Sequence, residues 1–152
     1  MKRIAFTLGV AVTTLVVAAG AADSARKYIV MKRPNNSTAP FSEAVLSGDT
    51  LYIAGHIGLD PQTGKPGETA DQEARLVMES FKKTIEEAGM EMDDLVSVTV
   101  YSSDVSDYSA FNTVYRPYFH GNFPARAYIG SGKLLFGARF EVQGIAVKRP
   151  KK

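Results

Sequence analysis

The segment FPARAYIG, residues 123–130, places one cationic side chain, Arg126, in an otherwise apolar run. The acidic residues nearest to it in the sequence are Asp107 and Glu141. Three roles fit such an arginine: a solvated surface charge, half of a structural ion pair with Glu141 on a neighbouring strand, or an anchor for a small anionic ligand. The third role suits the planar guanidinium, because it can give two parallel hydrogen bonds to a carboxylate.

Few other side chains could carry covalent or metal chemistry. The chain has no cysteine, which excludes a thiol nucleophile, disulfides and thiolate metal sites. With only His56 and His120, a zinc site of the common kinds is not expected, and an isolated His56 is more often a hydrogen-bonded structural residue than a catalytic one. The segment GSGK, residues 130–133, lacks the remaining glycine and the Ser or Thr of a phosphate-binding loop.

Apolar runs predict six strands around these residues. They cover residues 27–31, the two arms of a hairpin within 42–58, and residues 95–101, 126–131 and 139–147. The hairpin turns at residues 47–50, where Gly48 can adopt a positive φ.

Two helices are predicted between the strands. The first starts at Thr69, which fits a capping box with Gln72, and ends at Gly89. The second is expected to be capped by Ser106 and shortened in its last turn by Pro117. Their apolar stripes are Ala74, Val77, Met78, Phe81 and Ile85 in the first, and Phe111, Val114, Tyr115 and Tyr118 in the second.

The order of these elements predicts an α+β fold in which two helices cover one face of a mixed sheet. The other face of the sheet would need a partner, and in a chain of 152 residues a second subunit is the economical one. The length suits a single domain.

The N-terminus has the pattern of a Sec-type signal peptide: Lys2 and Arg3, then an uncharged run that ends in AAGAA. We expect cleavage near Ala21 or Ala22 and a periplasmic or secreted protein without stable membrane association. Lys2 and Arg3 account for the net charge of +2, so the remaining chain is neutral. A neutral chain lacks the basic face of a nucleic-acid binder, and no nucleic-acid partner is expected.

From Pro40 to Val147 the chain resembles the RidA (YjgF-type) family. Five segments carry the resemblance through their order and spacing: APFSEAV (39–45), LYIAGHIGLDPQTG (51–64), DYSAFNTVYRPYF (107–119), NFPAR (122–126) and FEVQGIAV (140–147). The resemblance implies a chorismate-mutase-like α+β fold of about six strands and two helices, assembled as a homotrimer with a ligand cleft between each pair of subunits. The chain then divides into a signal peptide (1–22), an N-terminal strand and loop (23–38) and a RidA-like domain (39–149).

The resemblance also implies an activity: hydrolytic deamination of 2-imino or enamine acids to 2-keto acids and ammonia, of the 2-iminobutanoate/2-iminopropanoate type, without a metal or organic cofactor. By position, Arg126 matches the arginine that holds the substrate carboxylate, and Glu141 matches the acid that positions the water. Asn112, Tyr115 and Gly55 match positions that shape the cleft. Little more is needed, because the carbon of a protonated C=N group is already electrophilic.

Four positions depart from the family pattern. Phe41 replaces a common tyrosine, Ala54 a serine, His56 a glutamine and Tyr128 a cysteine. The pocket would therefore lose two hydroxyl groups and gain a large ring beside Arg126. Two function classes stay open: an exported imine deaminase, and a non-catalytic trimer that binds small carboxylates at the same clefts.

Overall fold

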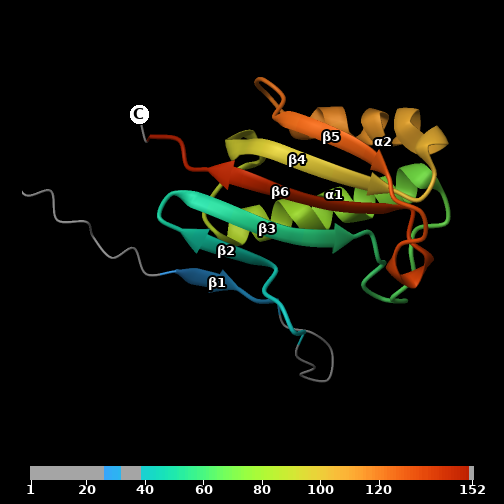
Figure 1. Ribbon diagram of the computed structural model, residues 1–152, viewed down its shortest axis with the longest axis horizontal. Helices are drawn as coiled ribbons and strands as arrows, with labels where there is room; N and C mark the ends of the chain where they lie inside the picture. Colours follow the sequence, from blue (N-terminus) through green and yellow to red (C-terminus); the bar gives the residue numbers. More distant parts are fainter. Residues whose placement is uncertain (1–25, 32–38, 151–152) are drawn as a thin grey trace, which may run out of the picture.

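The computed structural model describes residues 26–31 and 39–150 (Figure 1). The predicted signal peptide, residues 1–22, and its cleavage site lie outside the described residues. Within the described part, no helix has the length and apolar character that crossing a membrane requires.

A six-stranded mixed sheet forms the centre of the fold, in the order β1-β2-β3-β6-β4-β5 (Figure 1). Only β4 and β5 run parallel, and the other neighbours are antiparallel. The predicted hairpin turn joins β2 to β3, with Gly48 at a φ of 60°. The strands are β1 (Lys27–Ile29), β2 (Ala44–Ser47), β3 (Thr50–Ile57), β4 (Leu95–Ser102), β5 (Ala125–Gly130) and β6 (Phe140–Val147).

Helix α1 (Ala70–Glu87) begins and ends as the sequence predicts. Thr69 caps it through a capping box with Gln72, in which each side chain accepts a hydrogen bond from the other residue's backbone N–H. Gly89, at a φ of 73°, follows the last turn.

Helix α2 (Tyr108–Tyr115) is preceded by a 3-10 turn, η3 (Val105–Asp107), and followed by another, η4 (Arg116–Tyr118). The expected cap at Ser106 is wrong. Asp104 caps the segment instead, because its carboxylate accepts a hydrogen bond from the Ser106 backbone N–H at 2.8 Å. Pro117 tightens the last turn into η4, as predicted. Two further 3-10 turns are η2 (Met92–Asp94) and η5 (Leu135–Gly137).

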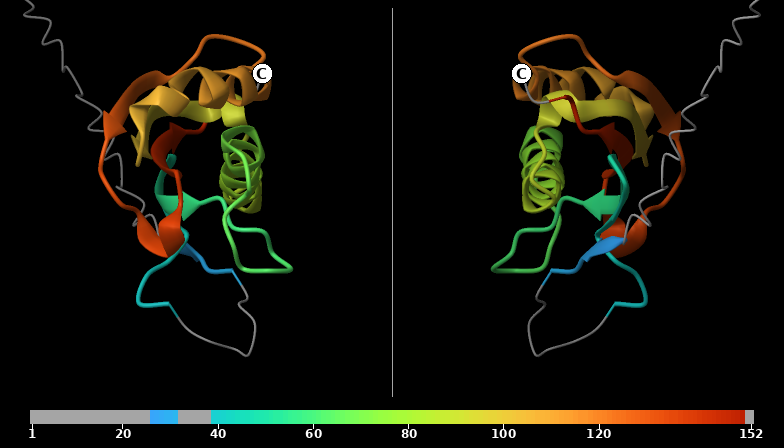
Figure 2. Two further views of the ribbon diagram at one scale, coloured as in Figure 1. Left: turned by 90° about the vertical axis from the view of Figure 1, so that its right-hand side faces the viewer. Right: turned by 90° about the vertical axis from the view of Figure 1, so that its left-hand side faces the viewer.

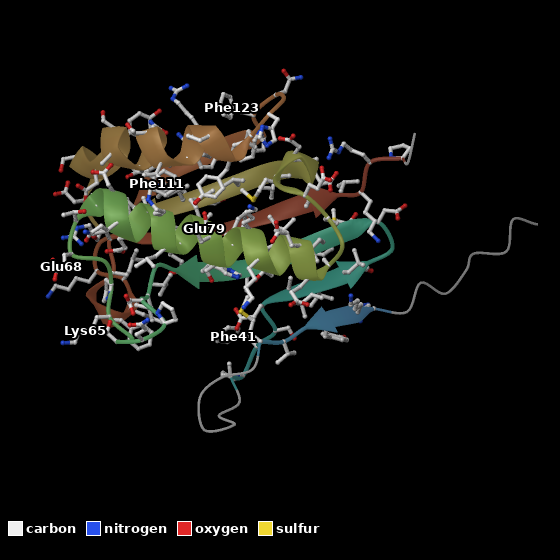
Figure 3. All side chains as sticks on the ribbon, turned by 180° about the vertical axis from the view of Figure 1, so that it is seen from behind. Phe41, Lys65, Glu68, Glu79, Phe111 and Phe123 are labelled. Carbon is white, nitrogen blue, oxygen red and sulfur yellow. The ribbon has the colours of Figure 1, made fainter. Side chains whose placement is uncertain are left out.

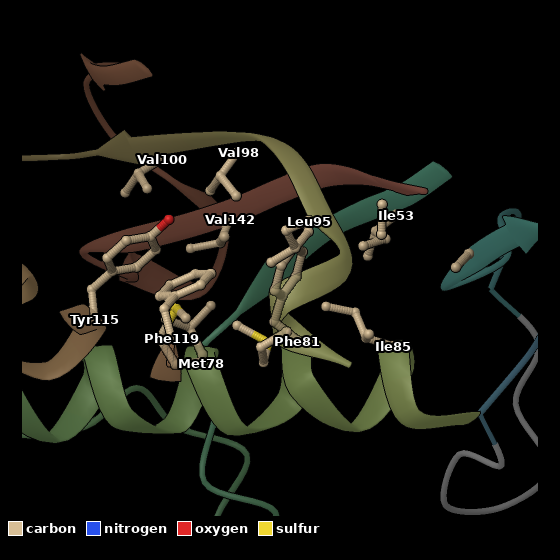
Figure 4. Packing of buried hydrophobic residues seen from close by; sticks show 14 of the residues in the cluster. Ile53, Met78, Phe81, Ile85, Leu95, Val98, Val100, Tyr115, Phe119 and Val142 are labelled. Atoms are coloured by element: carbon tan, nitrogen blue, oxygen red, sulfur yellow. The ribbon is translucent and has the colours of Figure 1, made fainter. Parts of the chain in front are cut away.

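Both helices pack on one face of the sheet, and Figure 2 shows them along the same side. Met78, Phe81 and Ile85 of α1 point toward the strands and are fully buried (Figure 4). Each such side chain contributes about 1.5–3 kcal/mol through burial. The core residues of the sheet are every second residue along the strands: Leu51, Ile53, Val98, Val100, Phe140 and Val142.

The residues between them face the opposite side of the sheet, which neither helix covers (Figure 2). Tyr52 and Ile129 lie on this face and are 53% and 42% exposed. We refer to it below as the open face of the sheet.

Candidate functional site

Arg126 lies in β5, the edge strand that packs beside α2 (Figure 1). Its side chain points to the helix side, because its partner in β4, Val98, is a core residue. A pocket of about 270 Å³ opens here. Its lining residues are Tyr108, Asn112, Tyr115, Arg116, Phe123, Pro124 and Arg126.

Neutral groups hold the Arg126 guanidinium. Its Nη2 donates a hydrogen bond to Asn112 Oδ1 at 2.6 Å, and its Cζ lies 4.4 Å from the centre of the Tyr115 ring. This arrangement brings three of the predicted site residues together in one pocket. The aromatic face contributes a cation–π attraction without neutralising the charge. A cation oriented in this way remains available to an anionic ligand.

The ion pair between Arg126 and Glu141, one of the three roles considered from the sequence, does not form within the chain. Strand β4 separates β5 from β6, and Glu141 pairs with Tyr101, on the open face. Among the described residues, no salt bridge involves Arg126. Arg126 is therefore not a paired structural arginine within its own subunit.

Sequence reasoning missed the aromatic wall that Tyr108 and Phe123 add to the pocket. The Phe123 ring stacks on Tyr115, with centres 6.3 Å apart, and Figure 3 shows Phe123 above α2. Tyr108 precedes Asn112 by four residues, so both lie on the same face of α2. That spacing was the available signal for Tyr108, while nothing in the sequence marks Phe123 beyond its nearness to Arg126.

The phenols around Arg126 differ in acidity. A hydrogen bond with Asn112 and the positive charge of Arg126 lower the pKa of Tyr108, which is 48% exposed. Burial raises the pKa of Tyr115 to about 12, although the Arg126 charge acts in the opposite direction. Tyr108 is therefore the phenol that releases a proton most readily in this pocket.

Tyr128 follows Arg126 by two residues and faces the same side, as predicted. Its ring packs edge-on against Tyr108, with centres 5.0 Å apart, and also contacts Phe111. Burial raises the pKa of Tyr128. The ring therefore packs behind Tyr108 and Phe111, and Tyr128 is not among the residues that line the pocket.

A second group of predicted site residues lies on the open face, where β3 meets β6. The register of β3 shifts between Ile53 and His56, and this bulge contains Ala54 and Gly55. A Cβ atom on Gly55 would collide with the carboxylate of Glu141. Only glycine at position 55 leaves room for the carboxylate of Glu141 in this position.

The remaining two predicted contacts lie away from Arg126. Phe41 precedes β2, is half exposed, and lies across the sheet from Phe123 in Figure 3. His56 is 4% exposed on the helix side, where its Nδ1 lies 2.9 Å from the Ala54 carbonyl and its Nε2 lies 2.8 Å from Thr84 Oγ1. Because a carbonyl only accepts, Nδ1 carries the proton and Nε2 accepts from Thr84. Within one subunit, these bonds give His56 a structural role.

The candidate residues thus divide into two half-sites on opposite faces of one sheet. Arg126, Asn112 and Tyr115 form the first, beside α2. Glu141 and Gly55 anchor the second, on the open face. Among the described residues, no group of three or more His, Asp or Glu side chains could hold a metal ion.

Comparison with known proteins identifies the family. The model of the family described as Endoribonuclease L-PSP matches residues 30–148. The chain belongs to this family. It is the family, also called RidA or YjgF, that the sequence motifs indicate, and its chorismate-mutase-like α+β fold is confirmed.

Several relatives of this RidA-family chain have names that refer to an activity. It is 37% identical to a bovine 2-iminobutanoate/2-iminopropanoate deaminase over 82% of this chain and 92% of the relative. It is 39% identical to a RutC family protein of Pyrococcus horikoshii over 81% and 98%. Among solved structures, E. coli TdcF with bound serine is 28% identical, with a TM-score of 0.74 over 81% of this chain and 99% of TdcF.

Proposed function

We propose that this RidA-family protein deaminates 2-imino acids and their enamine tautomers to 2-keto acids and ammonia. The observation that carries the proposal is Arg126, a half-buried guanidinium that no described carboxylate neutralises and that Asn112 and Tyr115 orient into a pocket. The relatives named as 2-iminobutanoate/2-iminopropanoate deaminases support this reaction class. The serine bound in the E. coli TdcF structure supports a ligand that carries a carboxylate.

The reaction needs orientation more than activation. Arg126 binds the substrate carboxylate through two parallel hydrogen bonds and so fixes the C=N carbon. Glu141 accepts a proton from water as the water oxygen bonds to that carbon, and the C=N electron pair moves to nitrogen. Glu141 then gives that proton to the nitrogen, which forms a neutral carbinolamine. The proton of the carbinolamine hydroxyl passes to the nitrogen as the C–N bond breaks, so ammonia leaves, the C=O bond of the 2-keto acid forms and Glu141 is again a carboxylate.

The two half-sites must meet for this chemistry, and a single subunit keeps them on opposite faces of its sheet. We propose that the protein is a homotrimer in which the Arg126 half-site of one subunit faces the Glu141 half-site of its neighbour. The uncovered open face, with Tyr52 and Ile129 exposed, supports such an interface.

The test uses an imine generated in situ from 2-aminobutyrate by an amino-acid oxidase. The wild-type protein should shorten the lifetime of the imine, and Arg126→Ala should lose this effect by at least about 100-fold, since a bidentate charge-assisted contact is removed. Arg75→Ala, at an exposed position of α1 that does not line this pocket, is the matched control and should retain full activity. Unchanged activity in Arg126→Ala would refute the assignment.

A second function is favoured by specific residues. Phe41 and Ala54 carry no hydroxyl group, and the Tyr128 ring fills space behind the pocket. Such a site could bind small carboxylates without accelerating hydrolysis. This alternative predicts that Arg126-dependent binding of 2-oxobutanoate, measured by calorimetry, is present while imine lifetimes are unchanged.

A further inference from the structure

The pocket beside α2 contains two guanidinium groups, and the proposed reaction uses only one of them. Arg116 opens η4 and lines the same pocket as Arg126. Its Cζ lies 6.0 Å from the centre of the Phe123 ring, while Arg126 lies over the Tyr115 ring. The two rings stack on each other at an interplanar angle of 26°. Each arginine is therefore placed by one member of a single aromatic pair.

No acidic side chain lines this pocket, and within the described ranges neither Arg116 nor Arg126 takes part in a salt bridge. Two other arginines within the described ranges are paired with carboxylates. Arg139 lies 3.1 Å from Glu73, and Arg149 lies 2.6 Å from Asp94. Within one subunit, the pocket therefore has two cations and no carboxylate among its lining residues, and its positive potential favours an anion of more than one charge.

The helix geometry explains how the two cations reach one pocket. Tyr108, Asn112 and Arg116 follow one another at intervals of four residues and so lie on one face of the α2–η4 segment. Asn112 contacts Arg126 across that face. Both arginines also act on the phenol of Tyr108, since the charges of Arg126 and Arg116 each help to lower its pKa. The two positive charges therefore converge on the same opening.

We infer that the preferred substrate is a 2-imino dicarboxylic acid, with its α-carboxylate on Arg126 and its distal carboxylate on Arg116. This inference rests on the proposed function and specifies its substrate class. A pocket of about 270 Å³ has room for an acid of this size. The exposed Arg116 can follow the distal carboxylate, whereas Asn112 fixes Arg126 and with it the reacting carbon.

The test compares imines made in situ from glutamate or aspartate with those made from 2-aminobutyrate. For wild-type protein, kcat/KM should be higher for the dicarboxylate imines. In Arg116→Gln, the ratio of dicarboxylate to monocarboxylate kcat/KM should fall about tenfold, as expected for the loss of one charge-assisted hydrogen bond. Arg116→Lys should keep part of the ratio, because it retains the charge without the fork. Arg75→Gln, on α1, should leave the ratio unchanged.

An Arg116→Gln ratio equal to that of wild type would overturn the inference, as would a wild-type preference for the monocarboxylate. If the wild type accelerates the hydrolysis of neither imine, the proposed deaminase function fails. The affinity for dicarboxylates and monocarboxylates then tests whether Arg116 binds a second carboxylate. Calorimetry with succinate and butanoate measures it directly. Tighter binding of succinate that is lost in Arg116→Gln supports the two-cation site, while equal binding of both acids refutes it.

Discussion

The partner of each arginine decides its role in this chain. Arg139 and Arg149 contact carboxylates and hold parts of the fold together. Arg126 contacts an amide and an aromatic ring instead, so its charge is oriented and not neutralised. Sequence alone could not separate these cases, because the partners lie far away in the chain. The NFPAR motif singled out Arg126 only because a family resemblance accompanied it, and its role as a carboxylate anchor stays a prediction.

His56 provides a residue-scale prediction about pH. Its pKa is lowered, chiefly because burial disfavours the charged ring, although the Ala54 carbonyl and the charge of Glu43 act in the opposite direction. The unfolded chain, with a histidine pKa near 6.5, therefore binds more protons than the folded chain just below that pH. The free energy of unfolding should decrease as the pH falls through about 6.5.

The control is His56→Gln, which removes the titrating group and keeps hydrogen-bonding capacity toward Thr84. We expect the free energy of unfolding of His56→Gln to be about 1 kcal/mol lower than that of wild type at pH 7.5, where the wild-type ring is neutral. Between pH 7.5 and 5, the free energy of unfolding should decrease less in His56→Gln than in wild type. Urea unfolding at several pH values measures both. Parallel pH profiles for the two proteins would contradict the prediction.

At the scale of elements, local sequence patterns predicted what local forces determine. The capping box at Thr69, the apolar stripe of α1 and the turn at Gly48 are confirmed, because each depends on residues a few positions apart. The predicted cap of α2 at Ser106 is wrong. Asp104 and Ser106 both suit a cap, but a 3-10 turn that contains Ser106 precedes α2, and Asp104 caps that turn. Arg116 and Tyr108 escaped notice because their role depends on β5 lying beside α2, which is a tertiary contact.

A buried carboxylate fixes the start of β6, and this contact was also invisible in the sequence. Glu73 of α1 is fully buried and accepts hydrogen bonds from the backbone N–H groups of Arg139 and Phe140 and from the Arg139 guanidinium. Arg139 in turn donates to the carbonyls of Gly67 and Glu68. Glu73 thus links α1, the loop before it and the strand that carries Glu141.

We predict that Glu73→Gln lowers the free energy of unfolding by about 2–3 kcal/mol, because a charge-assisted network loses its acceptor and an amide must occupy the buried site. Glu86→Gln is the matched control. Glu86 is exposed and pairs with Lys82 at 3.6 Å, so its loss should cost about 0.5 kcal/mol or less. Urea denaturation measures both values. Equal destabilisation by the two substitutions would show that the Glu73 network contributes nothing beyond a surface pair.

For the whole molecule, the sheet itself separates the two half-sites. Side chains alternate along each strand, so Arg126, opposite the core residue Val98, and Glu141, opposite Tyr101 on the open face, point in opposite directions. The sequence predicted both residues as partners in one reaction but could not show this separation, because strand order in the sheet is not a local property. The separation is what makes an assembly between subunits necessary for the proposed chemistry.

Subunit mixing tests this arrangement. Arg126→Ala and Glu141→Gln should each be inactive alone. In a mixed oligomer, a cleft that takes Arg126 from a Glu141→Gln subunit and Glu141 from an Arg126→Ala subunit has the complete wild-type set. A cyclic trimer that contains both variants has one such cleft, so mixed trimers should regain about a third of wild-type activity.

The measurement is imine lifetime after co-expression of the two variants, purified through different tags so that only mixed oligomers remain. The matched control mixes Arg126→Ala with Asn112→Ala, two substitutions that lie in the same half-site. Every subunit in this mixture carries a changed Arg126 half-site. No cleft can therefore have the complete wild-type set. Recovery in the first mixture and none in the second requires that each cleft combine opposite sheet faces of two subunits. Absence of recovery in both would place the reacting groups within one subunit, and the proposed cleft would be wrong.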